Sequence, residues 1–477
     1  MVDNSFYWFD YETFGKSPQW DKPAQFAGVR TDQNLKIIGE PLMLFCQPQS
    51  DYLPDPEASR ITGLKPTELK HTGLIEPDFI AKVVAELGYP GTCSVGYNSI
   101  RFDDEFTRHT LYRNFHDPYE YEWKDGNSRW DLLDVVRLTR ALRPDGIEWP
   151  INDDGKPSNK LEHLSAANNI QHEAAHDALS DVTATIDIAK LIKQSAPKLF
   201  RYALEHRDKQ SVAEILNVRR QKPCIHVSGM VPSEFGHVSI VLPIARVPNN
   251  NNGVIVLDLR TDPAELADLS AAQIAERVFI KDAELSGTTR LHIRTIQINK
   301  CPVLVPIQTL RDQDAERLGI DKSTQLARAN QWHQLPTERI AKNMVDAVSN
   351  RVFTASSDTE GNLYGGGFLS PADKTLCSKI RQAQPHQLSQ FANLFDDPRY
   401  NELLFRYRGR HFPDTLNEEE NIDWQDHRQR RLYADSADWI TFSTFDATMD
   451  SLDWAPEEQG LVESLREYRD SLYNELK

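Results

Sequence analysis

Two acidic residues close a run of bulky side chains near the N-terminus. The run covers residues 6–13, with the sequence FYWFDYET, and such an apolar stretch is typical of a strand buried on both faces. Because side chains alternate along a strand, Asp10 and Glu12 point to the same side of it. Two buried carboxylates repel each other unless a cation lies between them. Oxygen ligands favour Mg²⁺ or Mn²⁺, and two such ions about 3.5 to 4 Å apart are the arrangement used for in-line phosphoryl displacement.

A second acidic position follows a later strand. Acids make up 71 of the 477 residues, so the first pair is not specific by itself and further acids must complete the site. Residues 92–95 are predicted as a strand, and a turn at Gly96 leads into a helix that begins near Asp103 and Asp104. Either acid could cap that helix. Alternatively, one of them faces the first strand and completes a carboxylate cluster; the residues alone do not choose between the two acids.

A histidine and an acid five positions later flank the start of another helix. The apolar spacing after position 178 predicts this helix, and Asp177 is well placed to cap it. His176 then lies just before the helix and Asp181 lies one turn inside it. Together they supply a proton acceptor near neutral pH and a further metal ligand, both of which hydrolysis by water needs. Two other histidines nearby are interpreted as structural: His163 and His172.

Cations and aromatic side chains interleave between positions 108 and 143. The residues are Arg108, Tyr112, Arg113, Tyr119, Trp123, Arg129, Trp130, Arg137, Arg140 and Arg143. Bases stack on aromatic rings while arginines hold phosphates, so this composition suits a track for single-stranded nucleic acid. The alternative is an amphipathic helix whose arginines are simply solvated. Composition does not choose between the two.

The elements that must position these residues fall into three regions. The chain is too long for one hydrophobic core. Strands alternating with helices predict an α/β domain over residues 1–196, with an antiparallel meander extending from the first strand. A β-rich domain is expected over 197–352, where Asn252-Gly253 is a strong hairpin signal. A helical domain is expected over 353–477, where Ser370 should cap a helix and Leu461, Leu465, Tyr468 and Leu472 should form a buried stripe.

Composition excludes several classes of protein. Hydrophobic content of 39% and charged content of 26% are ordinary for a globular protein. No apolar run approaches the roughly 20 residues of a membrane span, and no secretory signal is recognisable, so a cytoplasmic protein is expected. The five cysteines are far apart, which argues against disulfides or a zinc site. The net charge of -17 argues against non-specific coating of nucleic acid but leaves room for a local basic groove.

The carboxylate and histidine set resembles the DEDD superfamily of 3′ to 5′ exonucleases, in its histidine-containing branch. More narrowly, several segments resemble the bacterial exonuclease I family. They are DYETFG at 10–15, PAQFA at 23–27, GYN at 96–98, RFDDE at 101–105, NSRWDLLD at 127–134, LEHL at 161–164, HVSGM at 226–230 and INKCP at 298–302, with a weaker echo at 405–408. The resemblance implies a ribonuclease H-like exonuclease domain, an SH3-like β-barrel and an all-α C-terminal domain. The barrel would close over the single strand and make digestion processive.

The resemblance also implies roles for individual residues. Asp10, Glu12, Asp103 and Asp181 would hold two Mg²⁺ ions, with Mn²⁺ able to substitute, and His176 would be the general base. Of the two acids left open above, the family pattern selects Asp103. Contacts with single-stranded DNA would come from Arg108, Tyr119, Trp123, Arg137 and Lys160, with Lys209 and Lys300 as further candidates. The family commonly has arginine at the position of Lys160, and lysine loses the bidentate phosphate grip.

The implied reaction is 3′ to 5′ hydrolysis of single-stranded DNA with release of nucleoside 5′-monophosphates, in DNA repair and recombination. The family suggests a protein partner, the acidic C-terminal tail of single-stranded-DNA-binding protein, docking near Arg143 and Tyr202, and a monomer is expected. Two alternatives stay open. One is the same chemistry on RNA, against which the long C-terminal half argues. The other is a binding scaffold that has lost catalysis, which a missing acid or histidine would favour; none is missing.

Overall fold

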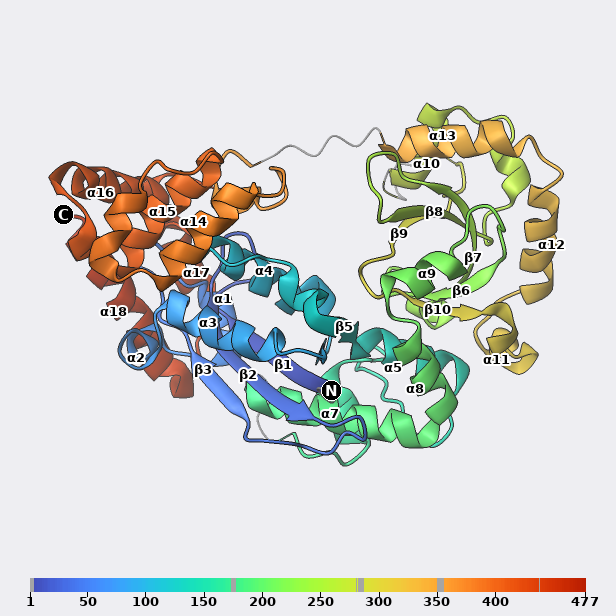
Figure 1. The fold of residues 1–477 in the computed structure, drawn as a ribbon. Coiled ribbons are helices and arrows are strands. Elements are labelled where there is room, and N and C mark those ends of the chain that lie inside the picture. Colours follow the sequence, from blue (N-terminus) through green and yellow to red (C-terminus); the bar gives the residue numbers. More distant parts are fainter. Residues whose placement is uncertain (1–3, 173–176, 280, 282–286, 350–355, 437) are drawn as a thin grey trace. The chain divides into compact units, whose positions relative to one another are not determined.

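A computed structural model of the chain describes residues 4–477 except 173–176, 280, 282–286, 350–355 and 437 (Figure 1). The chain divides into two compact units. The first comprises Met1–Ser128, His172–Thr183 and Thr354–Lys477, and the second comprises Arg129–Gln171 and Ala184–Phe353. Within the described residues, no helix is both long and apolar enough to cross a membrane. All five cysteines lie in the described part of the chain and none forms a disulfide.

The N-terminal sheet has the strand order β3-β2-β1-β4-β5. Its strands are β1 (Ser5–Thr13), β2 (Pro23–Thr31), β3 (Leu42–Phe45), β4 (Thr92–Gly96) and β5 (Ser128–Asp131). Strand β1 pairs with β2 in antiparallel and with β4 in parallel orientation, and β2 pairs with β3 in antiparallel orientation. The predicted meander and the α/β character of this region are therefore confirmed. The helices between the strands are α1 (Pro56–Thr62), α2 (Pro66–Thr72), α3 (Glu76–Leu87) and α4 (Asp103–Arg113).

The two faces of β1 have different roles. Tyr7, Phe9 and Tyr11 point into a hydrophobic core that also contains Phe26 of β2 and Phe79 of α3. Because the side chains alternate, Asp10 and Glu12 lie on the opposite face of the same strand. The apolar residues thus fix the register of β1, and this register places the two acids.

The C-terminal helices belong to the same compact unit as β1. They are α14 (Pro371–Gln382), α15 (Pro398–His411), α16 (Glu418–Tyr433), α17 (Phe442–Ser451) and α18 (Gln459–Glu475), coloured orange to red in Figure 1. As predicted, Ser370 caps α14 by accepting a hydrogen bond from the amide nitrogen of Asp373 at 3.1 Å. The predicted stripe on the last helix is buried as well.

Buried ion pairs join the N-terminal and C-terminal stretches of the first unit. Lys22 Nζ lies 2.7 Å from Glu360 Oε2, and both side chains are 1% exposed. Arg410 contacts both Glu360 and Asp51. Unpaired charges in such positions would be costly to bury, so each of these side chains depends on its partners.

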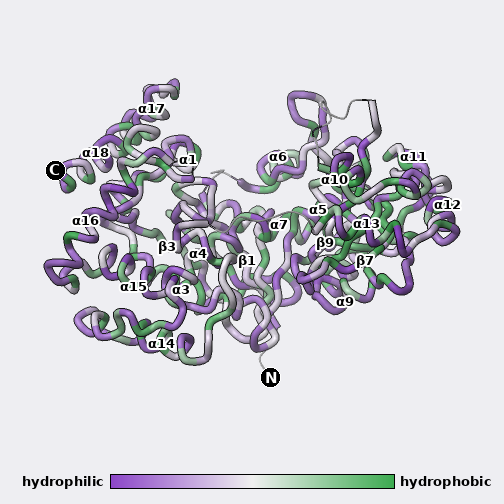
Figure 2. Tube along the Cα trace, turned by 90° about the horizontal axis from the view of Figure 1, so that it is seen from above, coloured by the Kyte–Doolittle hydropathy of each residue, from purple (hydrophilic) through white to green (hydrophobic). Residues whose placement is uncertain are grey.

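The second unit contains a five-stranded antiparallel sheet of order β10-β6-β7-β8-β9. The strands are β6 (Cys224–Val227), β7 (Val238–Arg246), β8 (Gly253–Asp258), β9 (Ile293–Gln297) and β10 (Val303–Pro306). Strands β7 and β8 form the predicted hairpin, with Gly253 at its turn. Figure 2 shows hydrophobic residues gathered around β7 and β9, and β7 and β8 are almost entirely buried.

Helices surround this sheet and precede it. They are α5 (Leu132–Leu142), α6 (Leu161–Ala167), α7 (Ala178–Ser195), α8 (Pro197–Glu205), α9 (Lys209–Ile215), α10 (Ala271–Phe279), α11 (Asp312–Arg317), α12 (Lys322–Trp332) and α13 (Thr337–Ser349). Helix α5 is amphipathic, and its apolar side is buried. It is the helix expected under the alternative interpretation, in which the arginines between positions 108 and 143 are simply solvated. Helix α7 begins in the first unit and continues into the second.

Candidate active site

Three acids from two elements come together at the end of β1. Carboxylate oxygens of Asp10, Glu12 and Asp181 lie within 4.8 Å of one another. Glu12 is 8% exposed, and the Asp181 side chain is 19% exposed. The alternation of β1 brings Asp10 and Glu12 to one face, and the first turn of α7 brings Asp181 to them. The structure therefore assembles three of the four acids predicted as metal ligands.

Asp103, the fourth acid, is fixed to β1 by a hydrogen bond. Its Oδ1 accepts from the amide nitrogen of Tyr11 at 3.1 Å, and the residue is 3% exposed. Helix α4 has Phe102 at its N-cap and no side-chain capping bond, so neither Asp103 nor Asp104 acts as the cap. Asp103 faces the first strand, which is the arrangement that the carboxylate interpretation required.

A tight turn carries the chain from β4 to Asp103. Gly96 ends β4, and a Cβ atom built on it would lie 2.6 Å from Cβ of Ser99 and 3.1 Å from the carbonyl oxygen of Phe9. Asn98 has a left-handed backbone, with φ of 68°, a conformation that asparagine tolerates better than most residues. Only a residue without a side chain fits at Gly96, so the Gly-Tyr-Asn segment sets where α4 starts.

The carboxylates are electrostatically strained in the absence of a cation. Burial, followed by the charges of Asp103 and Asp181, raises the pKa of Asp10 well above its usual range. Burial, followed by Asp181 and Asp103, raises the pKa of Glu12 to about 8. Each acid thus disfavours ionisation of its neighbours. A divalent cation removes this repulsion, and an all-oxygen ligand set is the kind that hard cations prefer. The residues present therefore fit the metal centre that the sequence predicts.

The start of α7 is tied to β2. Asp177 Oδ2 accepts from the amide nitrogen of Ser180 at 3.2 Å, which confirms the predicted cap. Its Oδ1 accepts from Nε2 of Gln25 at 3.1 Å, and Gln25 pairs with Glu12 in the β1–β2 register. The predicted general base, His176, lies outside the described residues. The residue that follows it is thus held against the strand beside Glu12.

Sequence reasoning missed one side chain at this site. His172 was interpreted as structural, yet its Nε2 lies 2.5 Å from Oδ1 of Asp181 and its side chain is 6% exposed. A histidine that orients a carboxylate ligand is a common supporting group at metal sites. His172 lies five residues before the predicted cap Asp177 and outside the helix. Helical periodicity therefore could not predict its contact with Asp181.

The predicted nucleic-acid contacts of the first unit lie on α4 and on the segment that follows it. Arg108 is 4% exposed and is held by Glu122 at 2.6 Å and Glu105 at 2.9 Å. Its guanidinium lies 5.5 Å from the centre of the Tyr119 ring. Trp123 is 65% exposed, which is unusual for so large an apolar side chain. The structure therefore brings Arg108 and Tyr119 together and leaves the Trp123 ring open to a ligand.

Three family models match the chain in succession. They are described as Exonuclease for residues 7–189, Exonuclease I SH3-like domain for 207–351 and Exonuclease I C-terminal domain for 357–472. Exodeoxyribonuclease I of Haemophilus influenzae is 46% identical over 435 residues, which are 91% of this chain and 91% of that protein. The Escherichia coli exodeoxyribonuclease I is 44% identical over 427 residues, 90% of each chain. The chain belongs to the exonuclease I family.

Solved structures of exonuclease I agree with the fold described above. Exonuclease I from Methylocaldum szegediense has a TM-score of 0.93 at 44% identity and covers 98% of this chain and 99% of that one. Escherichia coli exonuclease I in complex with a dA16 oligonucleotide has a TM-score of 0.93 at 40% identity, covering 98% and 100%. The ribonuclease H-like, SH3-like and helical architecture is thereby confirmed. The chain is an exonuclease, and membership of the family implies dependence on a divalent cation.

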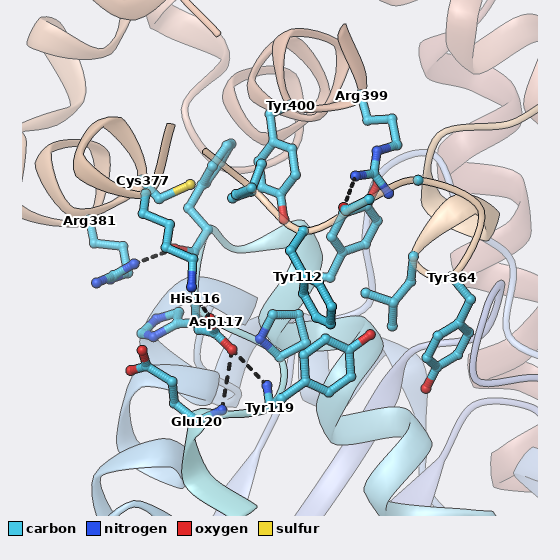
Figure 3. A pocket seen from close by; sticks show the side chains of 18 residues that line it. Tyr112, His116, Asp117, Tyr119, Glu120, Tyr364, Cys377, Arg381, Arg399 and Tyr400 are labelled. Atoms are coloured by element: carbon cyan, nitrogen blue, oxygen red, sulfur yellow. Dashed lines mark hydrogen bonds and ion pairs between the residues drawn. The ribbon is translucent and has the colours of Figure 1, made fainter. Parts of the chain in front are cut away.

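A cavity lies beside Tyr119, one of the predicted DNA contacts. It has a volume of about 390 Å³ and lies wholly within the first unit, between the end of α4 and the start of the C-terminal helices. Figure 3 shows Tyr119, Tyr112 and Tyr400 around it, with Arg399 and Arg381 at its sides. Aromatic faces combined with cations are the composition that accommodates bases and phosphates.

The predicted DNA contacts of the second unit lie on separate elements. Lys160 immediately precedes α6, and its side chain is 68% exposed and 3.3 Å from Glu162. Arg137 lies on α5 and pairs with Asp134 at 2.6 Å. The remaining two candidates are exposed: Lys209 in the first turn of α9 and Lys300 in the turn between β9 and β10.

The two predicted partner contacts also lie in the second unit. Arg143 Nη1 donates to the carbonyl oxygen of Thr309 at 3.2 Å. The Tyr202 ring stacks on His206 with centroids 3.9 Å apart, and the neighbouring Cys224 contributes to the raised pKa of Tyr202, after burial. A cavity of about 380 Å³ is lined by Cys224 and by Gln308, the residue before Thr309.

Proposed function

We propose that this exonuclease removes nucleotides from the 3′ end of single-stranded DNA and releases nucleoside 5′-monophosphates with the help of two Mg²⁺ ions. The observation that carries the proposal is the carboxylate cluster, in which acids from β1, α4 and α7 converge. The similar Escherichia coli enzyme has been solved in complex with single-stranded DNA, which supports the same substrate here.

The placement of the acidic side chains supports the following proposed roles. Asp10, Glu12, Asp103 and Asp181 hold the ions, with Mn²⁺ as a substitute, and His176 takes the proton of the attacking water. Glu12 also belongs to the catalytic group: its partner in β2, Gln25, holds Asp177, the residue that follows the proposed base His176. When bound, the ions acidify water and stabilise the charge that develops on the phosphate.

The strand is held by cations and aromatic rings. Arg108, Tyr119 and Trp123 provide this in the first unit, while Arg137 and Lys160 do so in the second. Lys209 and Lys300 extend the second set. The exposed Trp123 ring and the aromatic cavity beside Tyr119 suit bases, which stack without sequence preference. The SH3-like domain covers the strand and keeps the enzyme on it between cleavages.

Product analysis tests the direction and the chemistry. Uniformly labelled single-stranded DNA is digested with Mg²⁺, and the first products are identified by mass spectrometry. The proposal expects mononucleotides that carry a 5′-phosphate, formed first from the 3′ end. Products with a 3′-phosphate, or internal fragments, would contradict it.

We further propose the acidic tail of single-stranded-DNA-binding protein as a partner. The cavity that includes Cys224 and Gln308 is also lined by Arg220 and Lys222, and these cations complement an acidic peptide. The position of Arg143 beside Thr309 places another cation near this cavity. A ring such as Tyr202 can pack against an apolar side chain of the peptide.

Peptide binding tests this partner. A fluorescent peptide with the tail sequence should bind the wild-type enzyme and bind Arg143→Ala and Tyr202→Ala less tightly, by severalfold each. A scrambled acidic peptide is the control for charge alone. Equal binding of both peptides would contradict specific docking.

In the cell we place the enzyme, as a monomer, in the cytoplasm and in DNA repair and recombination. The absence of disulfides among its cysteines suits a reducing compartment.

A further inference from the structure

The loop between β6 and β7 packs closely on helix α5 within the second unit. At Gly236 of this loop, a Cβ atom would lie 3.6 Å from Cβ of Ala141 on α5. One helical turn earlier on α5, the guanidinium of Arg137 lies against Gly229 of the same loop. The loop therefore contacts α5 near two positions one turn apart.

The approach of Gly229 to Arg137 leaves no room for a side chain. A Cβ atom on Gly229 would lie 2.9 Å from Nη2 and 3.0 Å from Cζ and Nη1 of Arg137. The backbone of Gly229 is not in the left-handed region, so its φ and ψ angles do not disfavour alanine. The three atoms nearest to such a Cβ all belong to the Arg137 guanidinium.

Hydrogen bonds within the β6–β7 loop hold its backbone more firmly than the Arg137 guanidinium is held. Ser228 N donates to the carbonyl oxygen of His237 at 3.0 Å, and Val231 N donates to that of Ser228 at 2.9 Å. Met230 N also donates to Oγ of Ser228 at 3.3 Å. An added methyl group at Gly229 would therefore displace the flexible end of Arg137 rather than the loop.

The guanidinium is paired through one nitrogen, while its Nε is buried and makes no hydrogen bond to the described residues. Nη1 donates to Oδ1 of Asp134 at 2.6 Å, and the side chain is 17% exposed. Nη2 donates to no acceptor in the part of the chain that the structure describes. Because one edge is fixed, the other can receive a phosphate oxygen with little further loss of side-chain freedom.

We infer that Gly229 is a positioning residue for DNA binding: its missing side chain lets the β6–β7 loop hold the Arg137 guanidinium in the orientation that receives a DNA phosphate. The inference rests on the proposed contact between Arg137 and the strand and adds the residue that sets its geometry. It also gives the SH3-like domain a second use, since one of its loops orients an arginine of a helix outside the barrel.

A double-mutant cycle tests the inference in the full chain. Gly229→Ala, Arg137→Ala and the double variant are compared with wild type by fluorescence anisotropy of a 5′-labelled oligothymidine, with EDTA to prevent cleavage. Gly460→Ala is the matched control, because a Cβ atom there meets nothing nearer than the Lys65 side chain at 3.8 Å. Thermal melting shows whether each variant is folded.

Arg137→Ala should weaken binding about tenfold, as expected for loss of a charge-assisted hydrogen bond, and should lower the salt slope by about one. Gly229→Ala should weaken binding severalfold and raise KM while kcat is kept. The double variant should bind no more weakly than Arg137→Ala, because the added methyl group then has nothing to displace.

Three outcomes are decisive. Wild-type affinity of Gly229→Ala would overturn the inference. Effects that add in the double variant would overturn it too, since a loop damaged independently of Arg137 would still weaken binding in that background. Wild-type affinity of Arg137→Ala would instead overturn the proposed DNA contact, and with it the reason for positioning this arginine.

Discussion

The amide nitrogen of Tyr11 donates a hydrogen bond to Oδ1 of Asp103 at 3.1 Å. This bond joins the C-terminal part of β1 to the first residue of α4, across 92 positions of sequence. Tyr11 faces the hydrophobic core while its neighbours Asp10 and Glu12 face the site. Strand β1, which carries Asp10 and Glu12, therefore also fixes Asp103 through its own backbone.

Asp103→Asn should separate the charge of this residue from its hydrogen bond. The amide oxygen can still accept from Tyr11, so the fold should be kept. Activity should fall at least about a hundredfold, the scale on which groups that stabilise a transition state contribute. In metal-free buffer the thermal midpoint should rise, because Asp103 is one of the charges that raise the pKa of Asp10 and Glu12. Nuclease assays and melting curves check both effects.

Asp104→Asn is the matched control, because Asp104 is equally buried and adjacent in sequence. It should keep most of the activity, since the main charges that raise the pKa values of Asp10 and Glu12 include Asp103 and not Asp104. If Asp104→Asn were inactive and Asp103→Asn active, the assignment of the fourth carboxylate would be wrong.

Glu360→Gln should destabilise the first unit strongly. Glu360 is the acid that pairs with Lys22, whose pKa is lowered to about 8, mainly by burial. Removing one partner of a buried ion pair typically costs about 3 to 5 kcal/mol. Adding Lys22→Met should recover part of the loss, because no unpaired lysine then remains. Urea unfolding measures both variants; a double variant less stable than Glu360→Gln would contradict this account of the pair.

His109 should make the protein less stable as the pH is lowered from about 6.5 to 4, an effect opposite in sign to that of Asp10 and Glu12, whose pKa values are raised in the metal-free protein. Burial, followed by the charge of Arg113, lowers the pKa of His109 to about 4 from 6.5. A folded-state pKa below the unfolded value means that the unfolded chain binds more protons in this window, so acid favours unfolding. The stabilisation is complete above pH 6.5 and is lost as the pH falls through 4.

His109→Leu should flatten this dependence. Between pH 6.5 and 4, the thermal midpoint of wild type should drop relative to that of the variant. His116 keeps a contribution of the same sign in both proteins, because burial lowers its pKa to about 4 as well. The comparison uses slopes rather than absolute midpoints, since leucine also changes the packing. Parallel pH profiles for the two proteins would show that His109 does not titrate as described.

Lys160→Arg should tighten DNA binding. The family commonly has arginine here, and a guanidinium can grip a phosphate with two parallel hydrogen bonds. Lys160 is 68% exposed and its partner Glu162 lies 3.3 Å away, so the longer side chain fits without a clash. KM should fall severalfold with kcat little changed, as measured by steady-state digestion. A higher KM would show that the lysine is adapted to this site.

Most of the fold and the acids that come together at the candidate site could be predicted from the sequence. The aromatic run of β1, the glycine turn before α4 and the cap at Asp177 are local patterns, and each specifies its own element. The Asn-Gly turn predicted the β7–β8 hairpin in the same way. The family resemblance then selected Asp103 over Asp104, which local pattern could not do, because both occupy the first turn of one helix.

Contacts between distant segments could not be predicted. The bond between His172 and Asp181 and the approach of Gly229 to Arg137 depend on how whole elements pack. The same holds for the carboxylates that hold Arg108: Glu105 and Glu122 neutralise an arginine that composition alone presented as a free cation. Hydrophobic periodicity predicts which face of a helix or strand is buried, but it does not predict which residues of other elements that face contacts.

The central claim is tested most directly by a time course with 5′-labelled single-stranded DNA and RNA of equal sequence, each with Mg²⁺ or EDTA, beside the Asp10→Asn variant. The account predicts that DNA shortens from its 3′ end only with Mg²⁺, that the variant leaves it intact and that RNA is degraded far more slowly. Binding of DNA without degradation would contradict it and favour a scaffold. Preferential loss of RNA would contradict it and favour an exoribonuclease.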